Sequence, residues 1–420
     1  MPTTPTEAAA LLTISQAPML AQVEAWAAVN SGSGNLAGLA RIAEMLIAAF
    51  VPLGGTIALH EPTAVIAIDA SGEPQRLAHG RNFHLVQRPD ALVQVLLTGH
   101  MDTVFAADHP FQHCRWLDTT TLNGPGTADM KGGLAVMLAA LTALEASPFA
   151  SRIGYEIVIN SDEEVSSLGS AALLADAAKR CHLGLTFEPA LPDGTLAGAR
   201  KGSGNFAAVV HGRAAHAGRD PEHGRNAVVA AADLALRLAR LPAERPGISC
   251  NPAKLDGGGP NNIVPDMAVL RFNVRPANLD DQAWAQAKIA ALIAEVAAAH
   301  EVRITLDGSF ARPPKPLDAN QLRLFALIRD CGAALGLNLD WRDTGGVCDG
   351  NNLAAAGLAV VDTLGPRGSA IHSADEFLLI DSLVERAQLA ALLLMRVAQS
   401  GWMRVASSSE ARVPQLEPLA

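Results

Sequence analysis

The sequence has few cysteines, and none lies close to another along the chain. They are Cys114, Cys181, Cys250, Cys331 and Cys348, an odd number without any CxxC pair. A disulfide framework needs an even set of cysteines, and a thiolate zinc site needs closely spaced ones. We therefore expect neither in this chain.

Basic residues are also in the minority. The chain has 32 Lys and Arg against 42 Asp and Glu, a formal net charge of −10. No basic cluster could follow a phosphate backbone, so we expect no nucleic-acid partner. No uninterrupted apolar run reaches the roughly 18 residues of a membrane span, and residues 1–20 lack the pattern of a secretory signal. We expect a cytoplasmic protein with no membrane partner.

A chain of 420 residues is longer than one hydrophobic core supports, and its 49% hydrophobic content can fill two. From about residue 36 to 198, short apolar strands alternate with helices rich in Ala and Leu. This alternation predicts an α/β domain with a mainly parallel sheet. The expected strands are 92–98, 156–160 and 183–187, and the expected helices are 133–144 and 170–179.

The pattern changes after Gly198. It then predicts the order βαββαβ, with elements at 204–211, 225–240, 248–255, 267–274, 281–299 and 302–306. This order is the split sandwich of ferredoxin-like domains. We expect it to occupy residues 199–312 as an insertion between two parts of the first domain, 1–198 and 313–420. The last residues, 407–420, are expected to form a poorly ordered tail.

Imidazoles and carboxylates follow the expected strands at one edge of the sheet, where open α/β sheets bind ligands. Five of them form the predicted metal site: His100, Asp129, Glu164, Glu188 and His372. A ligand set without cysteine suits Zn²⁺ first, with Mn²⁺ or Co²⁺ as alternatives. One catalytic zinc needs about three protein ligands. Five ligands therefore predict two divalent ions, with Asp129 as the bridge.

The spacing of the neighbouring acids predicts different roles for them. His100 and Asp102 are two residues apart on extended chain, so Asp102 can accept the ring proton of His100. Glu163 and Glu164 project in opposite directions, so Glu164 would bind metal while Glu163 acts as the general base. Taken singly, the same residues also fit a surface imidazole beside an acid, or an acidic cap on the following helix.

The same segments carry a family resemblance. LLTGHMDTV, NGPGTADMKGG, NSDEEVSSLGS and GRAAHAG resemble segments of the M20 metallopeptidases, which include glutamate carboxypeptidase, acetylornithine deacetylase and aminoacylase. The motifs follow the family order from about residue 25 to 400, and NSGSGNLAGL resembles the glutamate carboxypeptidase branch most. The resemblance implies a zinc pair, with His100 and Glu188 on one ion, Glu164 and His372 on the other, and Asp129 between them. It also implies a cis peptide after Asp129.

The resemblance further implies that residues 199–312 form a lid and dimerisation domain, and therefore a homodimer. His216 would stabilise the oxyanion in the partner's active site, and Asn262 and Arg275 would bind substrate. By residue type Arg275 suits a bidentate grip on a carboxylate, although a salt bridge at a strand edge is the simpler interpretation. Arg312 is a further candidate for substrate contact. Cys348 stands where the family usually has Ser or Thr.

Together these features predict a metal-dependent hydrolase that cleaves an amide bond next to a free carboxylate. The first choice is a carboxypeptidase that releases a C-terminal amino acid such as glutamate. A deacylase of N-acyl amino acids is the alternative, because it would use the same catalytic residues. The third interpretation is a non-enzymatic metal-binding dimer, which the presence of Glu163 beside the five ligands disfavours.

Overall fold

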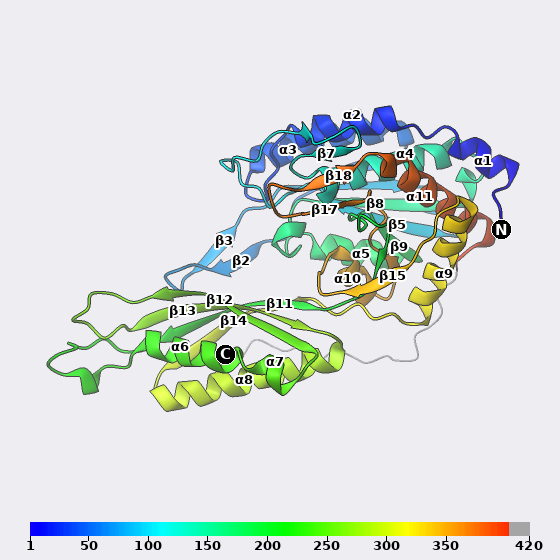
Figure 1. Cartoon of the computed structure of the whole chain (residues 1–420). Coiled ribbons are helices and arrows are strands. Elements are labelled where there is room, and N and C mark those ends of the chain that lie inside the picture. Colours follow the sequence, from blue (N-terminus) through cyan, green and yellow to red (C-terminus); the bar gives the residue numbers. More distant parts are fainter. Residues whose placement is uncertain (403–420) are drawn as a thin grey trace.

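The computed structural model describes residues 1–402, and the tail predicted at 407–420 lies outside them. Figure 1 shows a larger domain, which contains the N-terminus, and a smaller domain packed below it. The larger domain is formed by the two ends of the described chain, and the smaller one by its middle part.

The larger domain is built on a six-stranded sheet in the order β1-β4-β8-β5-β9-β16. These strands are β1 (Thr56–His60), β4 (Asn82–Gln87), β8 (Gly154–Asn160), β5 (Gln94–His100), β9 (Leu183–Thr186) and β16 (Ala359–Val361). The last four run parallel, whereas β4 is antiparallel to both of its neighbours, β8 and the edge strand β1. The predicted parallel part is present, but the sheet as a whole is mixed. The strands expected from the sequence did not include β1 and β4, so this edge was not predicted.

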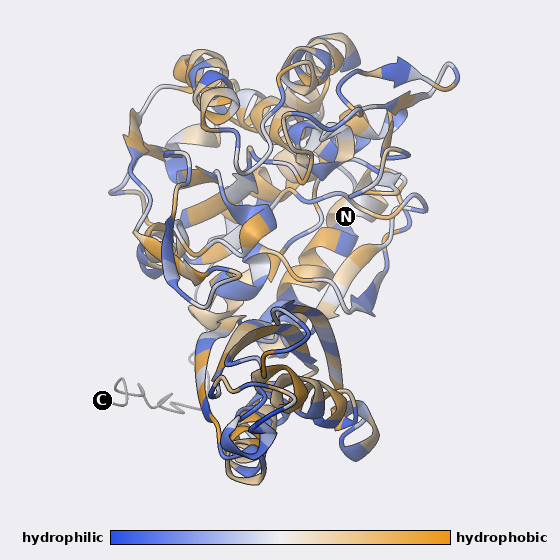
Figure 2. Ribbon diagram, turned by 90° about the vertical axis from the view of Figure 1, so that its left-hand side faces the viewer, coloured by the Kyte–Doolittle hydropathy of each residue, from blue (hydrophilic) through white to orange (hydrophobic). Residues whose placement is uncertain are grey.

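Helices cover both faces of this sheet (Figure 1). The first face carries α1 (Pro5–Leu11), α2 (Gln16–Ala27), α3 (Leu36–Phe50), α4 (Gly132–Glu145), α9 (Ala319–Ala334) and α11 (Asp381–Ser400). The second carries α5 (Ala171–Arg180) and α10 (Asp349–Ala355). Val95 and Leu97 of β5 pack on the first face and Leu96 on the second, as the period of a strand requires. Figure 2 shows hydrophobic and hydrophilic residues alternating along the ribbon of both domains.

Two helical stretches, Leu36–Leu53 and Thr127–Glu145, are long and apolar enough to cross a membrane by length and composition alone. The second is almost entirely buried in the core of the larger domain. The first is interrupted by Arg41 and Glu44, which pair with each other on its exposed side. The opposite side of α3 buries apolar residues against the sheet, which is the pattern of an amphipathic core helix.

The smaller domain has a four-stranded antiparallel sheet in the order β12-β13-β11-β14. Its elements are β11 (Ser203–His211), α6 (Ala227–Leu238), α7 (Leu241–Glu244), β12 (Ile248–Gly257), β13 (Met267–Pro276), α8 (Leu279–His300) and β14 (Arg303–Arg312). The predicted order βαββαβ is present, with α7 as an unpredicted short addition. Helices α6 and α8 cover one face of the sheet.

The other face of the small sheet meets a hairpin from the larger domain. This hairpin consists of β2 (Val65–Ile68) and β3 (Pro74–Leu77). Ile68 packs on Val209 and Val269, and its carbonyl accepts a hydrogen bond of 2.9 Å from Arg271 Nη2. The two domains are therefore in contact at this hairpin as well as through the chain segments that connect them.

The two connecting segments pair with each other. The backbone N–H of Arg200 donates to the Lys315 carbonyl, and that of Lys315 donates to the Arg200 carbonyl, at 2.9 and 3.0 Å. Both side chains are buried against Asp362, with Arg200 Nε at 2.7 Å and Lys315 Nζ at 2.8 Å from its Oδ2. Burial alone would raise the pKa of Asp362, but the two cations lower it below its usual value. The connection is thus a buried ion cluster.

Removing the carboxylate of this cluster tests its role. Asp362→Ala would leave Arg200 and Lys315 buried without an anion, so we expect a loss of about 3–5 kcal/mol in the free energy of unfolding. The control Asp176→Ala removes an exposed pair with Lys179, which water and salt screen, and should leave the free energy of unfolding nearly unchanged. Urea unfolding followed by circular dichroism measures both. Equal losses in the two variants would contradict the role of the cluster.

Candidate active site

The five predicted metal ligands meet at the carboxyl ends of the parallel strands. His100 is the last residue of β5, Glu164 lies in the turn after β8, and Glu188 follows β9. Asp129 lies in the loop before α4. His372 lies between β17 (Gly368–Ser369) and β18 (Phe377–Leu379), part of a small sheet with β7 (Thr121–Asn123) and β6 (Arg115–Trp116). The sheet thus brings together residues that are up to 272 positions apart in the sequence.

Asp129 stands at the centre of the group. Its Oδ1 lies 3.0 Å from His100 Nε2, and its Oδ2 lies 3.3 Å from His372 Nε2. Glu188 Oε2 is 3.7 Å from the first imidazole, and Glu164 Oε2 is 3.1 Å from the second. One carboxylate oxygen of Asp129 therefore lies with donor atoms of His100 and Glu188, and the other lies with donor atoms of His372 and Glu164. Donor atoms of His100, Asp129 and Glu164 lie within 4.8 Å of one another, close enough to share ions.

Burial and crowding shift the pKa values of these groups. Desolvation, together with the charge of Asp129, raises the pKa of Glu188 to about 7 and also raises the pKa of Glu164. Hydrogen bonds to Asp129 and Glu164 raise the pKa of His372 to about 11. Among residues 1–402, the carboxylates of Asp129, Glu164 and Glu188 make no ion pair with lysine or arginine. A donor set of this kind fits divalent cations.

Asp102 has more partners than the sequence indicated. The Nδ1 atom of His100 lies 3.0 Å from the Asp102 carbonyl oxygen and 3.4 Å from its Oδ1, so the backbone oxygen is the closer acceptor. The carboxylate accepts hydrogen bonds from the N–H groups of Glu163 and Glu164, both at 3.2 Å, and from Ser33 Oγ at 2.7 Å. Asp102 therefore orients His100 and also holds the turn that carries the two glutamates.

Glu163 and Glu164 point to different partners. Glu164 faces His372, whereas the Glu163 carboxylate lies 2.7 Å from Arg312 Nη2. Burial raises the pKa of Glu163 well above its usual value, although Arg312 opposes the shift. The alternative of an acidic helix cap does not hold, because α5 begins only at Ala171. Donor atoms of Glu163 also lie within 4.8 Å of those of His100 and Glu188, so the division between Glu164 as ligand and Glu163 as base stays a prediction.

The loop with Asp129 is held by a residue that the sequence reasoning missed. Glu376 is buried, and its carboxylate accepts hydrogen bonds from the N–H groups of Gly126, Ala128 and Asp129, each at 3.0 Å. Desolvation raises its pKa to about 8, against these donors. The peptide between Asp129 and Met130 is cis, as the resemblance implied. The sequence carries no signal for Glu376, because its backbone partners lie about 250 residues earlier in the chain.

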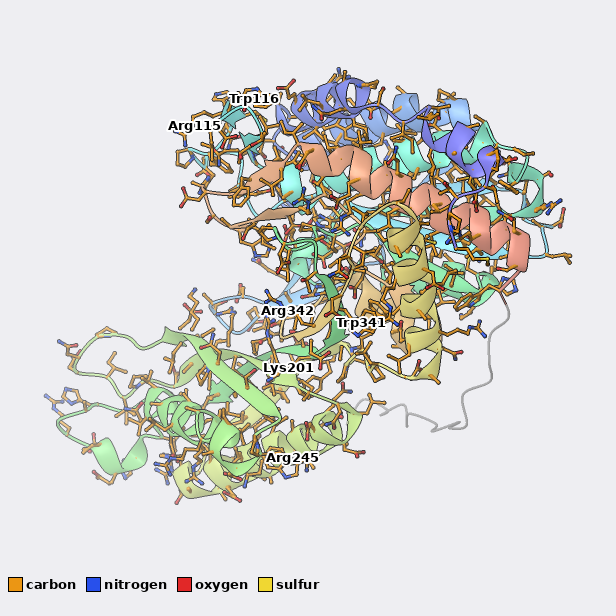
Figure 3. The ribbon with its side chains drawn as sticks, turned by 45° about the vertical axis from the view of Figure 1, so that its right-hand side comes forward. Arg115, Trp116, Lys201, Arg245, Trp341 and Arg342 are labelled. Atoms are coloured by element: carbon orange, nitrogen blue, oxygen red, sulfur yellow. The ribbon has the colours of Figure 1, made fainter. Side chains whose placement is uncertain are left out.

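The group opens into a cleft of about 840 Å³ between the two domains. Arg275 of β13 lines this cleft, where its Nε donates to Asn273 Oδ1 at 3.0 Å and its Nη1 to the Gly345 carbonyl at 2.9 Å. Its guanidinium makes no carboxylate ion pair within the described chain. Figure 3 shows Arg342 where the two domains meet, and Arg342 lines the same cleft.

Two predicted residues lie outside the cleft. His216 and Asn262 are exposed neighbours in the smaller domain: His216 forms a β-bridge with Ile263, and Ala217 N–H donates to the Asn262 carbonyl at 2.9 Å. Neither lines the cleft of its own chain. Arg312 lines the cleft, but its contacts are with protein groups. The roles of all three stay predictions.

Cys348 has a structural explanation for its position. It is the N-cap residue of α10, and its Sγ accepts a hydrogen bond from the Gly350 N–H at 3.3 Å. Ser and Thr are the usual residues for this purpose, because their hydroxyl oxygen satisfies a free N–H of the first helical turn. Burial raises the pKa of the Cys348 thiol well above its usual value. The substitution therefore keeps the cap while placing sulfur in the wall of the cleft.

Comparison with known proteins matches this geometry to a family. The model of peptidase family M20/M25/M40 matches residues 96–396. The chain belongs to this family. Carboxypeptidase G2 of Pseudomonas sp. strain RS-16 is 30% identical, over 87% of this chain and 86% of its own length. Succinyl-diaminopimelate desuccinylase of Methylobacterium radiotolerans is 28% identical, over 69% of this chain and 77% of its own.

Solved structures share the fold of this chain. The solved YxeP protein of Bacillus subtilis, a dinuclear metal binding peptidase of the M20 family, matches with a TM-score of 0.62 at 14% identity, over 92% of this chain and 99% of that one. The M20 chain described here is thus a metal-dependent hydrolase with a mixed α/β fold. The family match removes the interpretation of a non-enzymatic metal-binding dimer.

The role of Glu376 can be tested through metal affinity. Glu376→Gln keeps the size of the side chain but turns an amide N–H toward the backbone donors, so the loop with Asp129 should lose its fixed position. We expect the dissociation constant for Zn²⁺ to rise about 10–100-fold, measured by isothermal titration calorimetry. The neighbouring exposed Asp375→Asn is the control and should bind Zn²⁺ as the unchanged protein does. Unaltered affinity in Glu376→Gln would contradict this role.

Proposed function

We propose that the protein is a two-metal carboxypeptidase that releases a C-terminal amino acid, such as glutamate, from an acylated or peptidyl substrate. The observation that carries the proposal is the position of Asp129, which presents one oxygen to each of two imidazoles beside the buried Glu163. Two divalent ions, zinc by first choice, with manganese or cobalt as alternatives, would be held by His100 and Glu188 on one side and His372 and Glu164 on the other. Bound there, they would polarise the scissile carbonyl and acidify a water.

Glu163 is the proposed general base. Its raised pKa suits a group that takes a proton from the attacking water and later delivers it to the leaving amine. Asp102 holds the backbone of this glutamate and the ring of His100, so that base and ligand keep a fixed relation. Glu163 would thus transfer the proton, and Asp102 would hold Glu163 and His100 in the positions that this transfer needs.

Arg275 is the proposed anchor for the substrate carboxylate. It reaches from the smaller domain across the cleft, and no acidic side chain of the described residues neutralises it in an ion pair. A planar guanidinium in that position can grip a carboxylate with two parallel hydrogen bonds. This anchor accounts for cleavage next to a free carboxylate, which carboxypeptidase and deacylase have in common.

The size of the cleft favours the carboxypeptidase over the deacylase. About 840 Å³ is within the range of sites for drug-sized ligands and exceeds what an acetylated amino acid fills. The alternative, an N-acyl-amino-acid deacylase, keeps support from the relative that is a desuccinylase. Chromatography of products from N-acetyl amino acids, dipeptides and folate-like substrates separates the two.

A homodimer completes the proposed site. His216 and Asn262 lie side by side on the smaller domain, exposed and away from their own cleft, so a partner chain is the route by which they would reach a substrate. On the same domain, α6 exposes Val229 and Leu236, which are 51% and 64% exposed. Seven residues apart, they share one face of the helix. An apolar face of this kind favours contact with a second chain in the cytoplasm, the proposed location.

The roles of the two glutamates make opposite predictions. Glu163→Gln should lower kcat at least about 100-fold, because proton transfer is lost, and should keep both metal ions. Glu164→Gln should lose metal, because it removes a ligand. Metal analysis by inductively coupled plasma spectrometry and assays on zinc-loaded protein measure both effects. Metal loss from Glu163→Gln would show that we have interchanged the two roles.

The role of Arg275 predicts a loss of discrimination. For an N-acyl amino acid with a free carboxylate, Arg275→Ala should lower kcat/KM about 100-fold, which is the loss of about 2–3 kcal/mol of charge-assisted hydrogen bonding. The α-amide of the same substrate, which has no carboxylate, should be cleaved equally by both proteins. Comparing the two substrates is the internal control. An equal loss on acid and amide would exclude Arg275 as the anchor.

A further inference from the structure

Arg312 is the residue whose surroundings differ most from its predicted role as a substrate contact. It is the last residue of β14, the strand that ends the smaller domain, and its backbone pairs with Ser203 at the start of β11. Its side chain leaves the smaller domain and enters the larger one. The side chain is only 7% exposed, although it borders the cleft.

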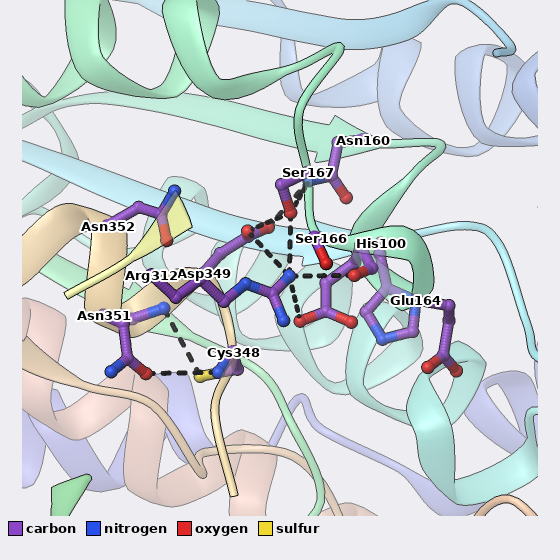
Figure 4. Close-up of polar contacts among 12 residues, drawn as sticks. His100, Asn160, Glu164, Ser166, Ser167, Arg312, Cys348, Asp349, Asn351 and Asn352 are labelled. Atoms are coloured by element: carbon purple, nitrogen blue, oxygen red, sulfur yellow. Dashed lines mark hydrogen bonds and ion pairs between the residues drawn. The ribbon is translucent and has the colours of Figure 1, made fainter. Parts of the chain in front are cut away.

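The contacts of Arg312 converge on the segment that carries Glu163 (Figure 4). Its Nη2 donates to the Glu163 carbonyl at 2.8 Å and to Ser167 Oγ at 2.9 Å. The same Nη2 lies 2.7 Å from Glu163 Oε1. Because the N–H groups are directed at the other two acceptors, this third contact is an ion pair and not a directed hydrogen bond. One guanidinium nitrogen thus holds the backbone and the carboxylate of the same residue.

A second carboxylate supports this arrangement from behind. Asp349, the first residue of α10, accepts hydrogen bonds from Ser167 Oγ at 2.5 Å and Asn160 Nδ2 at 2.7 Å. Its Oδ1 lies 3.6 Å from Arg312 Nη2. Asp349 therefore fixes the hydroxyl that Arg312 contacts and adds a distant negative charge. The buried guanidinium is thus held in one place by groups from both sequence segments of the larger domain, the one before and the one after the smaller domain.

We propose that Arg312 is a positioning residue for the general base, and that it makes the position of Glu163 depend on the end of the smaller domain. This inference rests on the proposed function, in which Glu163 moves the proton. Removing Arg312 would leave the Glu163 carboxylate without its cation, and the turn after β8 would keep its contacts with Asp102. Loss of Arg312 should then slow the chemical step and leave substrate binding unchanged. Loss of a carboxylate anchor would instead weaken substrate binding.

Steady-state kinetics on zinc-loaded protein with N-benzoyl-L-glutamate distinguishes the two roles. Arg312→Ala should lower kcat about 100-fold and change KM less than about threefold, on the acid and on its α-amide alike. Arg312→Lys keeps the positive charge but not the planar guanidinium with its several N–H donors, and it should recover part of kcat. Arg303→Ala, at the exposed opposite end of β14, is the matched control and should be unchanged. A raised KM with unchanged kcat, on the acid only, would overturn the proposal.

Thermal unfolding provides a readout that needs no turnover. Arg312→Ala should lower Tm, and it should lower Tm less in a Glu163→Gln background, because part of the loss is an uncompensated buried carboxylate. An equal decrease in both backgrounds would overturn the pairing. If zinc-loaded wild-type protein cleaves no substrate of the panel, the proposed function fails and the positioning role fails with it. The thermal cycle still decides whether Arg312 and Glu163 are coupled.

Discussion

The mutual repulsion of buried carboxylates is the constraint on which the rest of this structure depends. Asp129, Glu164 and Glu188 approach the same two imidazoles, and each has lost most of its hydration. Such a group costs several kcal/mol per charge unless positive charge is supplied within a few ångströms. The two imidazoles supply part of it, and divalent ions can supply the rest. The fold must therefore hold these groups together against a force that separates them.

Polar groups from several elements resist that force. Glu376 binds the backbone of the loop with Asp129, and Asp102 binds the backbone of the turn with Glu163 and Glu164. Both supports act on N–H groups, which a carboxylate binds strongly when it is buried. Their own negative charge adds to the site, so that the arrangement gains rigidity at the expense of further repulsion. Arg312 places one positive charge close to Glu163 within this group of carboxylates.

Residues at the ends of parallel strands could be predicted from the sequence, because the topology of the sheet alone brings them to one edge. His100, Glu164 and Glu188 are of this kind, and the pairing of the ligands around Asp129 followed from the resemblance to the family. The contacts of Glu376, and those of Arg312 with Glu163 and Ser167, could not be predicted, because they join segments separated by more than 100 residues with no periodic pattern. The antiparallel edge of the sheet was missed for a related reason. A short apolar strand has the same sequence pattern whether it pairs antiparallel or parallel with its neighbour.

The connection between the domains shows how far the same electrostatic logic extends. Arg200 and Lys315 on the two connecting segments and Arg312 at the end of β14 are buried cations, and each is paired with a carboxylate of the larger domain. A connection that only had to let one domain move would be better served by small or solvated residues, because buried ions need defined partners. The cations at these positions instead link the placement of the smaller domain, which carries Arg275, to the charges of Glu163 and Asp362. A change in the relative position of the domains would therefore alter the proposed substrate anchor, Arg275, and the proposed base, Glu163, together.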